Sequence, residues 1–468
     1  MHRSAGWIAE AVSGTLNGAD RQVVMNRVVT DSRSASAGSA YVARIGEATD
    51  GHEYVKQAVD NGAVALIVEH LVDVPSSIAQ IVVEDSTYAL GRLAHAHLED
   101  LRERFGLDVI AMTGSAGKTT TKDLLFQIMS TDAPSVAPQL SFNNEVGLPL
   151  TVLQADETTR HLVLEMGASG IGHIKYLTDI ASPDVAIELM VGHAHLGGFG
   201  GVDGIEKAKG ELITGSRPGA PVVLNYDDPR VMNMTKLSTG PITTFSPSGK
   251  EGADFRALDV DVDHLGRAHF TLEAPGGRGL VNLNIVGVHH VANALAAIAG
   301  AVQLGLELDQ AIRAINEARA LSPHRMDVVD LSIDGMKVTM IDDAYNANLD
   351  SMRAAFATLN SIGDGHTKIA VLSEMLELGD ESADIHRQVG LMAKDAGVES
   401  LILLGQDAPY YAEGAGDTID AEHVGSVDEA VTAVCAKLKD NCVILVKGSL
   451  FSYSWKVADQ LREKGVQR

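Results

Sequence analysis

Short apolar runs alternate with amphipathic, helix-forming stretches along most of the chain. In its centre these runs are 107–112, 161–164, 185–189 and 221–224, and each is followed by a polar or glycine-containing segment. Short buried strands separated by helices are typical of a mostly parallel sheet with helices covering it. The pattern therefore predicts an α/β fold.

The length of 468 residues exceeds what one hydrophobic core usually supports and predicts two to four domains. The pattern of apolar runs and helical stretches divides the chain into three α/β domains. The predicted boundaries are 1–105 for a small N-terminal α/β domain, 106–320 for a central domain with a phosphate-loop-type sheet, and 321–468 for a Rossmann-like C-terminal domain. Alternating short strands and Gly/Pro turns at 246–284 predict a β-rich excursion of the central domain. Binding sites in such sheets lie at the carboxyl ends of the strands.

The net charge of the chain restricts its partners. Lys and Arg number 37 and Asp and Glu 62, for a formal charge of −25. This balance argues against a general nucleic-acid binder and against a protein that binds anionic membranes, although a local cationic cluster can still hold an anionic substrate. The N-terminal residues lack the apolar core of a signal peptide, and no apolar run approaches the ~20 residues that cross a bilayer. We expect a cytoplasmic protein without membrane insertion.

A glycine-rich loop joins the run at 107–112 to an amphipathic helix at 119–129, and it reads Thr113-Gly114-Ser115-Ala116-Gly117-Lys118-Thr119-Thr120. Glycines let the backbone wrap a phosphate closely, and the N–H groups at a helix start carry partial positive charge. Lys118 is suited to neutralise β- and γ-phosphates, and Thr119 to place its hydroxyl on Mg²⁺. The loop is two residues shorter than the common G-x-x-x-x-G-K-[ST] form, but strand, turn, Lys-Thr and helix follow in the required order, which predicts nucleotide binding.

From this loop onward the chain resembles the Mur ligases, a family that builds the peptide stem of bacterial peptidoglycan. The segments that carry the resemblance follow in family order: Asn143-Asn144-Glu145-Val146-Gly147-Leu148-Pro149-Leu150, Leu164-Glu165-Met166-Gly167-Ala168, Ala194-His195-Leu196, Ala208-Lys209-Gly210-Glu211, Asn225-Tyr226-Asp227-Asp228, Gly287-Val288-His289-His290-Val291-Ala292-Asn293, and His324-Arg325-Met326. The implied activity is ATP-dependent joining of a carboxylate to an amine through an acyl phosphate.

Within the family, four segments resemble the ligases that add D-alanyl-D-alanine to UDP-N-acetylmuramoyl-tripeptide. They are 31–33 with 46–52, Asp342-Asp343-Ala344-Tyr345-Asn346-Ala347-Asn348, Glu374-Met375-Leu376-Glu377-Leu378-Gly379, and Lys447-Gly448-Ser449. The resemblance implies these two substrates as partners, for a protein that we expect to be a monomer. Four positions depart from the family pattern: His290, Leu349, Ser373-Glu374 and Leu450. None of them lies in the phosphate loop or among the expected metal ligands.

The resemblance also assigns roles to single residues. Lys118, Glu165, His195 and Lys209 are the expected catalytic residues. Two Mg²⁺ ions would be held by Thr119, Glu165, His195 and Lys209, with the lysine carbamylated by CO₂ because an ammonium group cannot bind a cation. The nucleotide would contact Gly114, Ser115, Ala116, Gly117, Lys118, Thr119, Thr120, Asn144, Asn293, Arg325 and Asp343. For His289, contact with the base and a purely structural role remain equally open.

Substrate-binding residues are expected in both outer domains. The uridine nucleotide would contact Ser32, Arg33, Gly46, Asp50, Gly51 and His52, although turn formation alone also explains the two glycines. The peptide or dipeptide would contact Tyr345, Asn346, Asn348, Lys447 and Ser449. Alternatives are a sister ligase that adds the third stem residue, a folate polyglutamylating enzyme, and a nucleotide-binding scaffold without catalysis.

Overall fold

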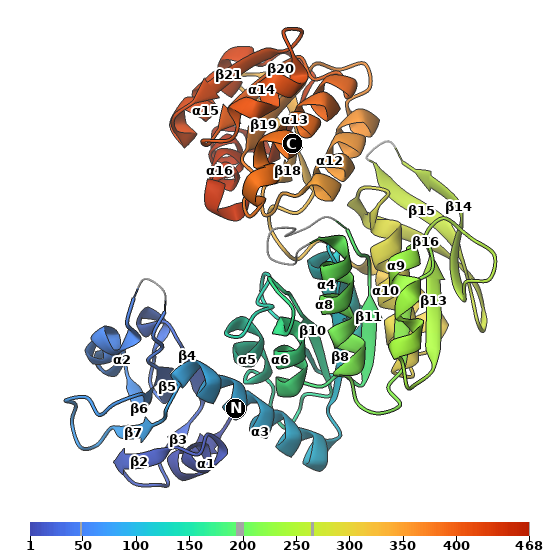
Figure 1. Cartoon of the computed structure of the whole chain (residues 1–468). Helices are drawn as coiled ribbons and strands as arrows, with labels where there is room; N and C mark the ends of the chain where they lie inside the picture. Colours follow the sequence, from blue (N-terminus) through green and yellow to red (C-terminus); the bar gives the residue numbers. More distant parts are fainter. Residues whose placement is uncertain (47–48, 193–200, 264–265, 468) are drawn as a thin grey trace.

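Each of the three predicted α/β units forms around a sheet of its own, and the units follow one another along the molecule (Figure 1). The computed structural model describes residues 1–46, 49–192, 201–263 and 266–467. The predicted fold class, three α/β domains with a mostly parallel central sheet, is confirmed.

The N-terminal sheet has the strand order β2-β7-β6-β5-β4 and is parallel except for the β2–β7 pair. Its strands are β2 (Thr15–Gly18), β4 (Arg27–Val29), β5 (Ser39–Val42), β6 (Ala63–Val68) and β7 (Ala79–Val82). β1 (Arg3–Ser4) and β3 (Val24–Met25) form a separate ribbon, and the helices are α1 (Ala5–Ala11), α2 (Val55–Asp60) and α3 (Ser86–Phe105).

Helix α3 joins the N-terminal and central domains. Asp85 caps its start by accepting a hydrogen bond from the Tyr88 N–H, and the helix ends at Gly106 in the left-handed conformation, at φ 68°. The buried His97 in its centre accepts a hydrogen bond from Arg3 and donates one to the Ala155 carbonyl, at 2.9 Å. These contacts join both domains through one helix.

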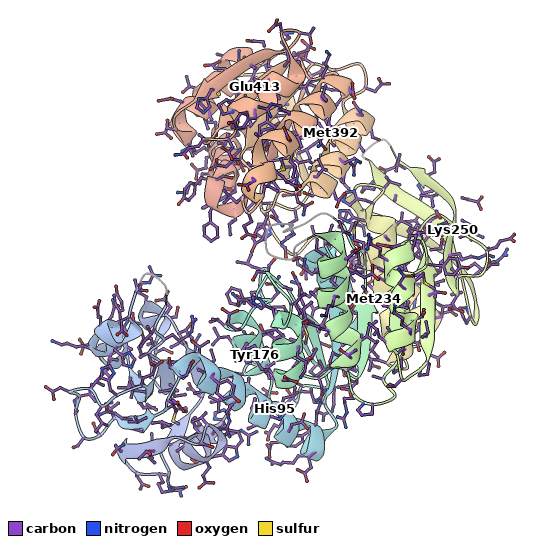
Figure 2. All side chains as sticks on the ribbon, in the orientation of Figure 1. His95, Tyr176, Met234, Lys250, Met392 and Glu413 are labelled. Carbon is purple, nitrogen blue, oxygen red and sulfur yellow. The ribbon has the colours of Figure 1, made fainter. Side chains whose placement is uncertain are left out.

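A second pair of contacts ties the same helix to α6 (His173–Ile180) of the central domain. The His95 ring bonds to the Ile180 carbonyl at 3.1 Å, and the Tyr176 hydroxyl lies where it would be 2.6 Å from a Cβ added to Gly91. Figure 2 labels His95 on α3 and Tyr176 on α6. The N-terminal domain is therefore held to the central one along a helix face.

The central sheet has the strand order β16-β15-β14-β13-β12-β11-β8-β10-β9 in the described residues. From β9 to β14 all neighbours are parallel, and β14, β15 and β16 add an antiparallel extension where the sequence predicts a β-rich segment. The strands are β8 (Asp108–Thr113), β9 (Ser135–Val136), β10 (His161–Glu165), β11 (Val185–Glu188), β12 (Val222–Asn225), β13 (Ile242–Ser246), β14 (Phe255–Val262), β15 (Arg267–Ala274) and β16 (Gly277–Val286).

Helices cover both faces of the central sheet. One apolar core lies between the sheet and α4 (Lys118–Met129), α10 (His290–Gln303) and α11 (Leu308–Glu317). The other involves α3, α5 (Gly147–Val152), α6 and α8 (Val202–Thr214), while the short α9 (Pro229–Met232) packs beside β12. This two-sided cover explains why the strands read as continuous apolar runs rather than alternating ones.

The C-terminal sheet has the order β21-β20-β19-β22-β18-β17-β23, parallel from β21 to β18. Its strands are β17 (Asp327–Ile333), β18 (Met336–Asp343), β19 (Lys368–Ser373), β20 (Ser400–Leu404), β21 (Asp420–Val424), β22 (Cys442–Lys447) and β23 (Val466–Gln467). One face is covered by α12 (Leu349–Ile362), α13 (Ser382–Asp395) and α14 (Pro409–Ala415), and the other by α15 (Val427–Lys437) and α16 (Ser454–Lys464).

The described part of the chain contains no helix that is both long and apolar enough to cross a membrane.

At the amino ends of β8 and β10, far from the phosphate loop, His161 lies between two carboxylates. Its ring nitrogens are 2.9 Å from Asp108 and 2.9 Å from Asp132. Burial lowers the pKa of His161, but the hydrogen bonds and charges of the two aspartates outweigh burial and raise it above the ordinary value. The protonated ring is therefore favoured by folding.

We expect His161→Gln to destabilise the protein most at low pH. A raised folded pKa gives a contribution that is complete below the unfolded pKa of about 6.5 and is lost as pH rises through the folded value. Two charge-assisted hydrogen bonds suggest a loss of roughly 1–3 kcal/mol near the acid end. Thermal midpoints of wild type and variant, measured across the pH range, test this. A gap between the two proteins that widens with rising pH would contradict it.

Candidate functional site

The phosphate-type loop lies where the sequence predicts it, between β8 and α4. Gly117 precedes the helix in the left-handed conformation, at φ 84°, and Lys118 folds over the loop to donate a hydrogen bond to the Gly114 carbonyl at 2.8 Å. The Ser115 hydroxyl accepts from the Gly192 N–H at 2.8 Å, which ties the loop to the segment after β11. Free N–H groups at the helix start are thereby presented at the carboxyl edge of the sheet.

The carboxylate of Glu165 lies directly beneath this helix start, at the end of β10. It is 1% exposed and accepts a hydrogen bond from the Thr119 hydroxyl at 2.8 Å and another from the Asn143 amide at 2.7 Å. A hydroxyl and a carboxylate are the oxygen ligands that Mg²⁺ prefers, usually together with phosphate oxygens and water. The described residues contain no group of three or more His, Cys, Asp or Glu side chains that could hold a metal. The Thr119 hydroxyl and the Glu165 carboxylate fit a Mg²⁺ ion that also binds nucleotide phosphate oxygens.

Asn293 of α10 supports the loop from behind. The amide oxygen of Asn293 accepts from the Thr121 hydroxyl at 3.3 Å, and the amide nitrogen is 2.9 Å from the His290 ring. A Cβ built on Gly117 would lie 2.4 Å from that amide oxygen. Asn293, expected to contact the nucleotide, thus lies against the phosphate loop. Asn144, by contrast, is exposed, and its side chain accepts from the Gly147 N–H at the start of α5.

Arg325 reaches this site from the C-terminal domain. The guanidinium of Arg325 donates to the Ser141 hydroxyl at 2.7 Å, and Ser141 in turn lies 3.0 Å from the Thr119 hydroxyl. The same guanidinium stacks over the Tyr345 ring at 4.2 Å. Its neighbours His324 and Met326 both have positive φ, 56° and 53°, so the chain turns sharply where it enters the domain.

Lys209 lies on α8, buried with only 7% of its surface exposed. Burial, reinforced by the charge of Lys118 and opposed by that of Glu188, lowers the pKa of Lys209 to about 7. A fraction of the amine is therefore neutral at physiological pH, which reaction with CO₂ requires. His195, another expected metal ligand, lies outside the described residues.

Lys118 is also buried, and its pKa is lowered like that of Lys209. Burial lowers the pKa of Lys118, and Arg325 lowers it further, whereas Glu165 raises it. Two cations and one acidic group thus converge on the loop in a chain whose overall charge is strongly negative.

In the C-terminal domain, Lys447 is fully buried at the end of β22. The ammonium of Lys447 donates to the Asp343 carboxylate at 2.5 Å and to the Asn346 carbonyl at 2.9 Å, while Asp343 also accepts from the Met326 N–H at 3.1 Å. Lys447 and Asp343 therefore hold the segment that carries Tyr345 against the domain entry. Asn348 caps α12 with Ser351, and the Ser449 hydroxyl accepts from the Leu376 N–H at 3.1 Å.

The six expected uridine ligands lie in the N-terminal domain, away from the phosphate loop. Their side chains are engaged locally: Ser32 with Gln57 at 2.6 Å, Arg33 with Asp31 at 2.7 Å, and Asp50 with the His52 ring at 2.6 Å. Gly51 passes close to Arg44, where a Cβ would meet the backbone nitrogen at 2.6 Å, and Gly46 bonds to the Thr49 carbonyl.

Comparison with known proteins places this architecture in a family. Three family models match successive parts of the chain: "Mur ligase family, catalytic domain" at 25–99, "Mur ligase middle domain" at 112–301 and "Mur ligase, glutamate ligase domain" at 324–450. The UDP-N-acetylmuramoyl-tripeptide–D-alanyl-D-alanine ligase of Mycobacterium bovis is 36% identical over 97% of this chain and 96% of its own length. The chain belongs to the Mur ligase family.

Two solved structures are similar to this Mur ligase over nearly its whole length. A MurF structure from Acinetobacter baumannii has a TM-score of 0.87 at 32% identity and covers 99% of both chains. The MurF ligase from Thermotoga maritima in complex with ADP has a TM-score of 0.79 at 28% identity, covering 94% of this chain and 97% of its own.

Sequence reasoning missed two residues that the fold brings into this Mur ligase site. Asn143 contacts Glu165, although its neighbour Asn144 was the expected ligand. Glu188 ends β11 fully buried, and in the sequence it is the one charged residue within the apolar run 185–189. An acidic residue near the carboxyl end of a buried run was the available signal, because the carboxyl ends of parallel strands lie at the site edge.

We expect Gly117→Ala to weaken ATP binding by about tenfold or more. A left-handed φ costs an alanine roughly 1–2 kcal/mol, and its Cβ would collide with Asn293, so the loop or Asn293 must shift. Calorimetric titration with ATP measures the effect.

Gly106→Ala is the matched control. Gly106 also has a left-handed φ, 68°, but no described heavy atom lies within 4 Å of a Cβ built there, and the residue is remote from the loop. This variant should lower thermal stability and leave ATP affinity unchanged. Equal affinities in Gly117→Ala and wild type would contradict the role of the loop conformation.

Proposed function

We propose that this chain is an ATP-dependent ligase that adds D-alanyl-D-alanine to UDP-N-acetylmuramoyl-tripeptide during peptidoglycan precursor synthesis. Relatives with that name match it from end to end. The single observation that carries the chemistry is the joint placement of Thr119, Glu165 and Lys118 at one helix start. A scaffold without catalysis would have no need for a buried carboxylate there.

The reaction needs an activated carboxylate, because oxide is too poor a leaving group for amide formation. A substrate carboxylate oxygen attacks the γ-phosphorus of ATP, the bond to the β-phosphate oxygen breaks, and ADP leaves. The dipeptide amine then attacks the acyl carbon, loses a proton and expels inorganic phosphate. Both reacting partners of the first step are anionic, so cations along the transfer path lower its barrier.

The residues of this chain supply that charge and geometry. Lys118 stabilises negative charge on the transferred phosphoryl group, and the N–H groups at the start of α4 bind phosphate oxygens. Arg325 delivers a guanidinium from the C-terminal domain to the same edge. Thr119, Glu165, His195 and carbamylated Lys209 would hold two Mg²⁺ ions, which supply further positive charge to the phosphate oxygens.

The three domains divide the substrates among them. Residues 1–105 bind the uridine nucleotide, 106–320 bind ATP, and 321–468 bind the incoming dipeptide. Lys447 is buried in the C-terminal domain and donates hydrogen bonds to Asp343 and Asn346. This supports a role in shaping the dipeptide site rather than in direct contact with the dipeptide. Tyr345, packed on Arg325, is the residue that links that site to the phosphate loop.

Phosphate release from ATP tests the proposed function and its alternatives. We expect release only when UDP-N-acetylmuramoyl-tripeptide and D-alanyl-D-alanine are both present. Release with single amino acids and not with the dipeptide would identify a sister ligase. No release under any combination would favour a scaffold.

Lys118→Ala should lose activity while keeping its fold. If that variant retained more than about a tenth of wild-type kcat, a barrier change below ~1.4 kcal/mol, Lys118 would have no such role.

Lys209→Ala should be nearly inactive, and added formate or acetate should restore part of the turnover. A free carboxylate entering the vacated space can take the place of the carbamate, with an entropic handicap because it is not tethered. Lys209→Arg should not be rescued, since the guanidinium fills the space with the wrong charge. Turnover measured against carboxylate concentration tests both variants.

Lys207 provides the control, because it lies exposed on the same helix two residues earlier. Lys207→Ala should behave as wild type with or without added acid. Full activity of Lys209→Ala in the absence of any acid would refute the carbamate.

A further inference from the structure

Glu188 is a buried ionisable group beside Lys209 that the proposed chemistry leaves without a role. It is 0% exposed, and within the described residues neither of its carboxyl oxygens has a hydrogen-bond partner. Burying an ionised carboxylate without a hydrogen-bond partner costs far more free energy than burying the neutral acid. Burial raises the pKa of Glu188 well above its ordinary value, against the opposing charge of Lys209. A carbamylated Lys209 no longer carries that positive charge, so Glu188 beneath it is a carboxylic acid, which can donate one O–H hydrogen bond.

A second unpartnered donor lies next to Glu188. Thr113, the last residue of β8, is also 0% exposed, and its hydroxyl has no partner among the described residues. Glu188 and Thr113 are register partners on adjacent parallel strands, so their side chains leave the sheet on the same face. Two buried donors side by side without acceptors indicate that an acceptor group belongs between them and the element above.

The element above is α8, which carries Lys209. Leu224, the register partner of Glu188 on β12, packs in one apolar cluster with Ile205 and Ala208 of α8. Glu188 therefore lies between Thr113 and Leu224 beneath the helix turn that carries the buried Lys209, and the two groups interact electrostatically. The nearby Asp228 is occupied with the Val191 and Arg230 N–H groups, at 2.8 and 2.9 Å.

We propose that Glu188 is a positioning residue for the carbamate of Lys209, to which it donates a hydrogen bond as an uncharged acid, with the Thr113 hydroxyl as second donor. This proposal rests on the proposed function, in which Lys209 is carbamylated. The neutral amine attacks the carbon of CO₂, an N–C bond forms, one C–O π pair moves to oxygen, and one N–H proton passes to solvent. The product is a carbamate anion, whose oxygens can accept the hydrogen bonds for which Glu188 and Thr113 have no other acceptor. The second carbamate oxygen remains for the metal.

Three variants of Glu188 and Thr113 separate this role from a structural one. Glu188→Gln keeps an uncharged donor of the same shape, Glu188→Leu removes the donor at similar volume, and Thr113→Val removes the hydroxyl. The readouts on the full-length enzyme are the bicarbonate concentration that half-activates phosphate release in CO₂-depleted buffer, and the ¹³C carbamate signal after equilibration with ¹³C-bicarbonate. The wild-type signal must disappear in Lys209→Ala.

We expect Glu188→Leu to raise the half-activating bicarbonate concentration by about tenfold or more, and Thr113→Val to raise it in the same direction. Glu188→Gln should stay within about threefold of wild type. Saturating bicarbonate should restore both the carbamate signal and turnover in Glu188→Leu. Its thermal midpoint should be no lower than that of wild type, because an apolar side chain replaces an unpartnered polar one.

Several results would overturn the proposal. Wild-type bicarbonate dependence in Glu188→Leu would remove the need for a donor, and should that variant fail to fold, an unchanged Thr113→Val would do the same. Equal damage in Glu188→Gln and Glu188→Leu would show that negative charge is what matters. A wild type without any Lys209-dependent carbamate signal would refute the role of Glu188 together with the modification. The phosphate-release assay with and without each substrate tests the proposed ligase function separately. Its result does not depend on any of these outcomes.

Discussion

The hydrogen-bonded register of three parallel strands is the constraint on which the rest of the site depends. β8 lies between β10 and β11, with Met112 opposite Glu165 on one side and Thr113 opposite Glu188 on the other. Because successive side chains of a strand point to opposite faces, this register sends Glu165 toward α4 and Glu188 toward α8. A slip of one residue in the β8–β10 pair would turn Glu165 to the other face and leave the phosphate loop without its carboxylate, and a slip in the β8–β11 pair would turn Glu188 away from α8.

Burial gives the ionisable groups of this site their properties. Glu165 is paired with a hydroxyl and an amide, Lys118 with the loop carbonyl, and Lys209 lies where its neutral form is accessible. In water these side chains would be ordinary surface charges. Buried between two helical layers, they interact several times more strongly than in water, because the effective dielectric constant there is lower. A few cationic groups can therefore attract phosphate even though the chain has a net charge of −25.

The C-terminal domain contributes through one short segment. His324, Arg325 and Met326 turn sharply at the domain entry, and the Asp343–Lys447 pair fixes the segment that follows β18. Arg325 therefore has a rigid base from which to reach Ser141 across the domain boundary. Backbone strain of this kind persists only where surrounding contacts hold it, and here the contacts belong to the same segment.

The sequence by itself determined the α/β class, the division into three domains, the strand–loop–helix unit at 108–129 and the family, because these depend on periodicity and local order. It did not reveal β21, an edge strand with mostly exposed residues, or the hairpin strand β17, because partly exposed strands lack a continuous apolar run. Only the tertiary structure decided that Asn143 rather than Asn144 contacts Glu165, that Lys447 is sealed by Asp343, and that Glu188 and Thr113 adjoin beneath α8. Those relations join residues distant in sequence, and strand register and helix packing set them, neither of which local pattern encodes.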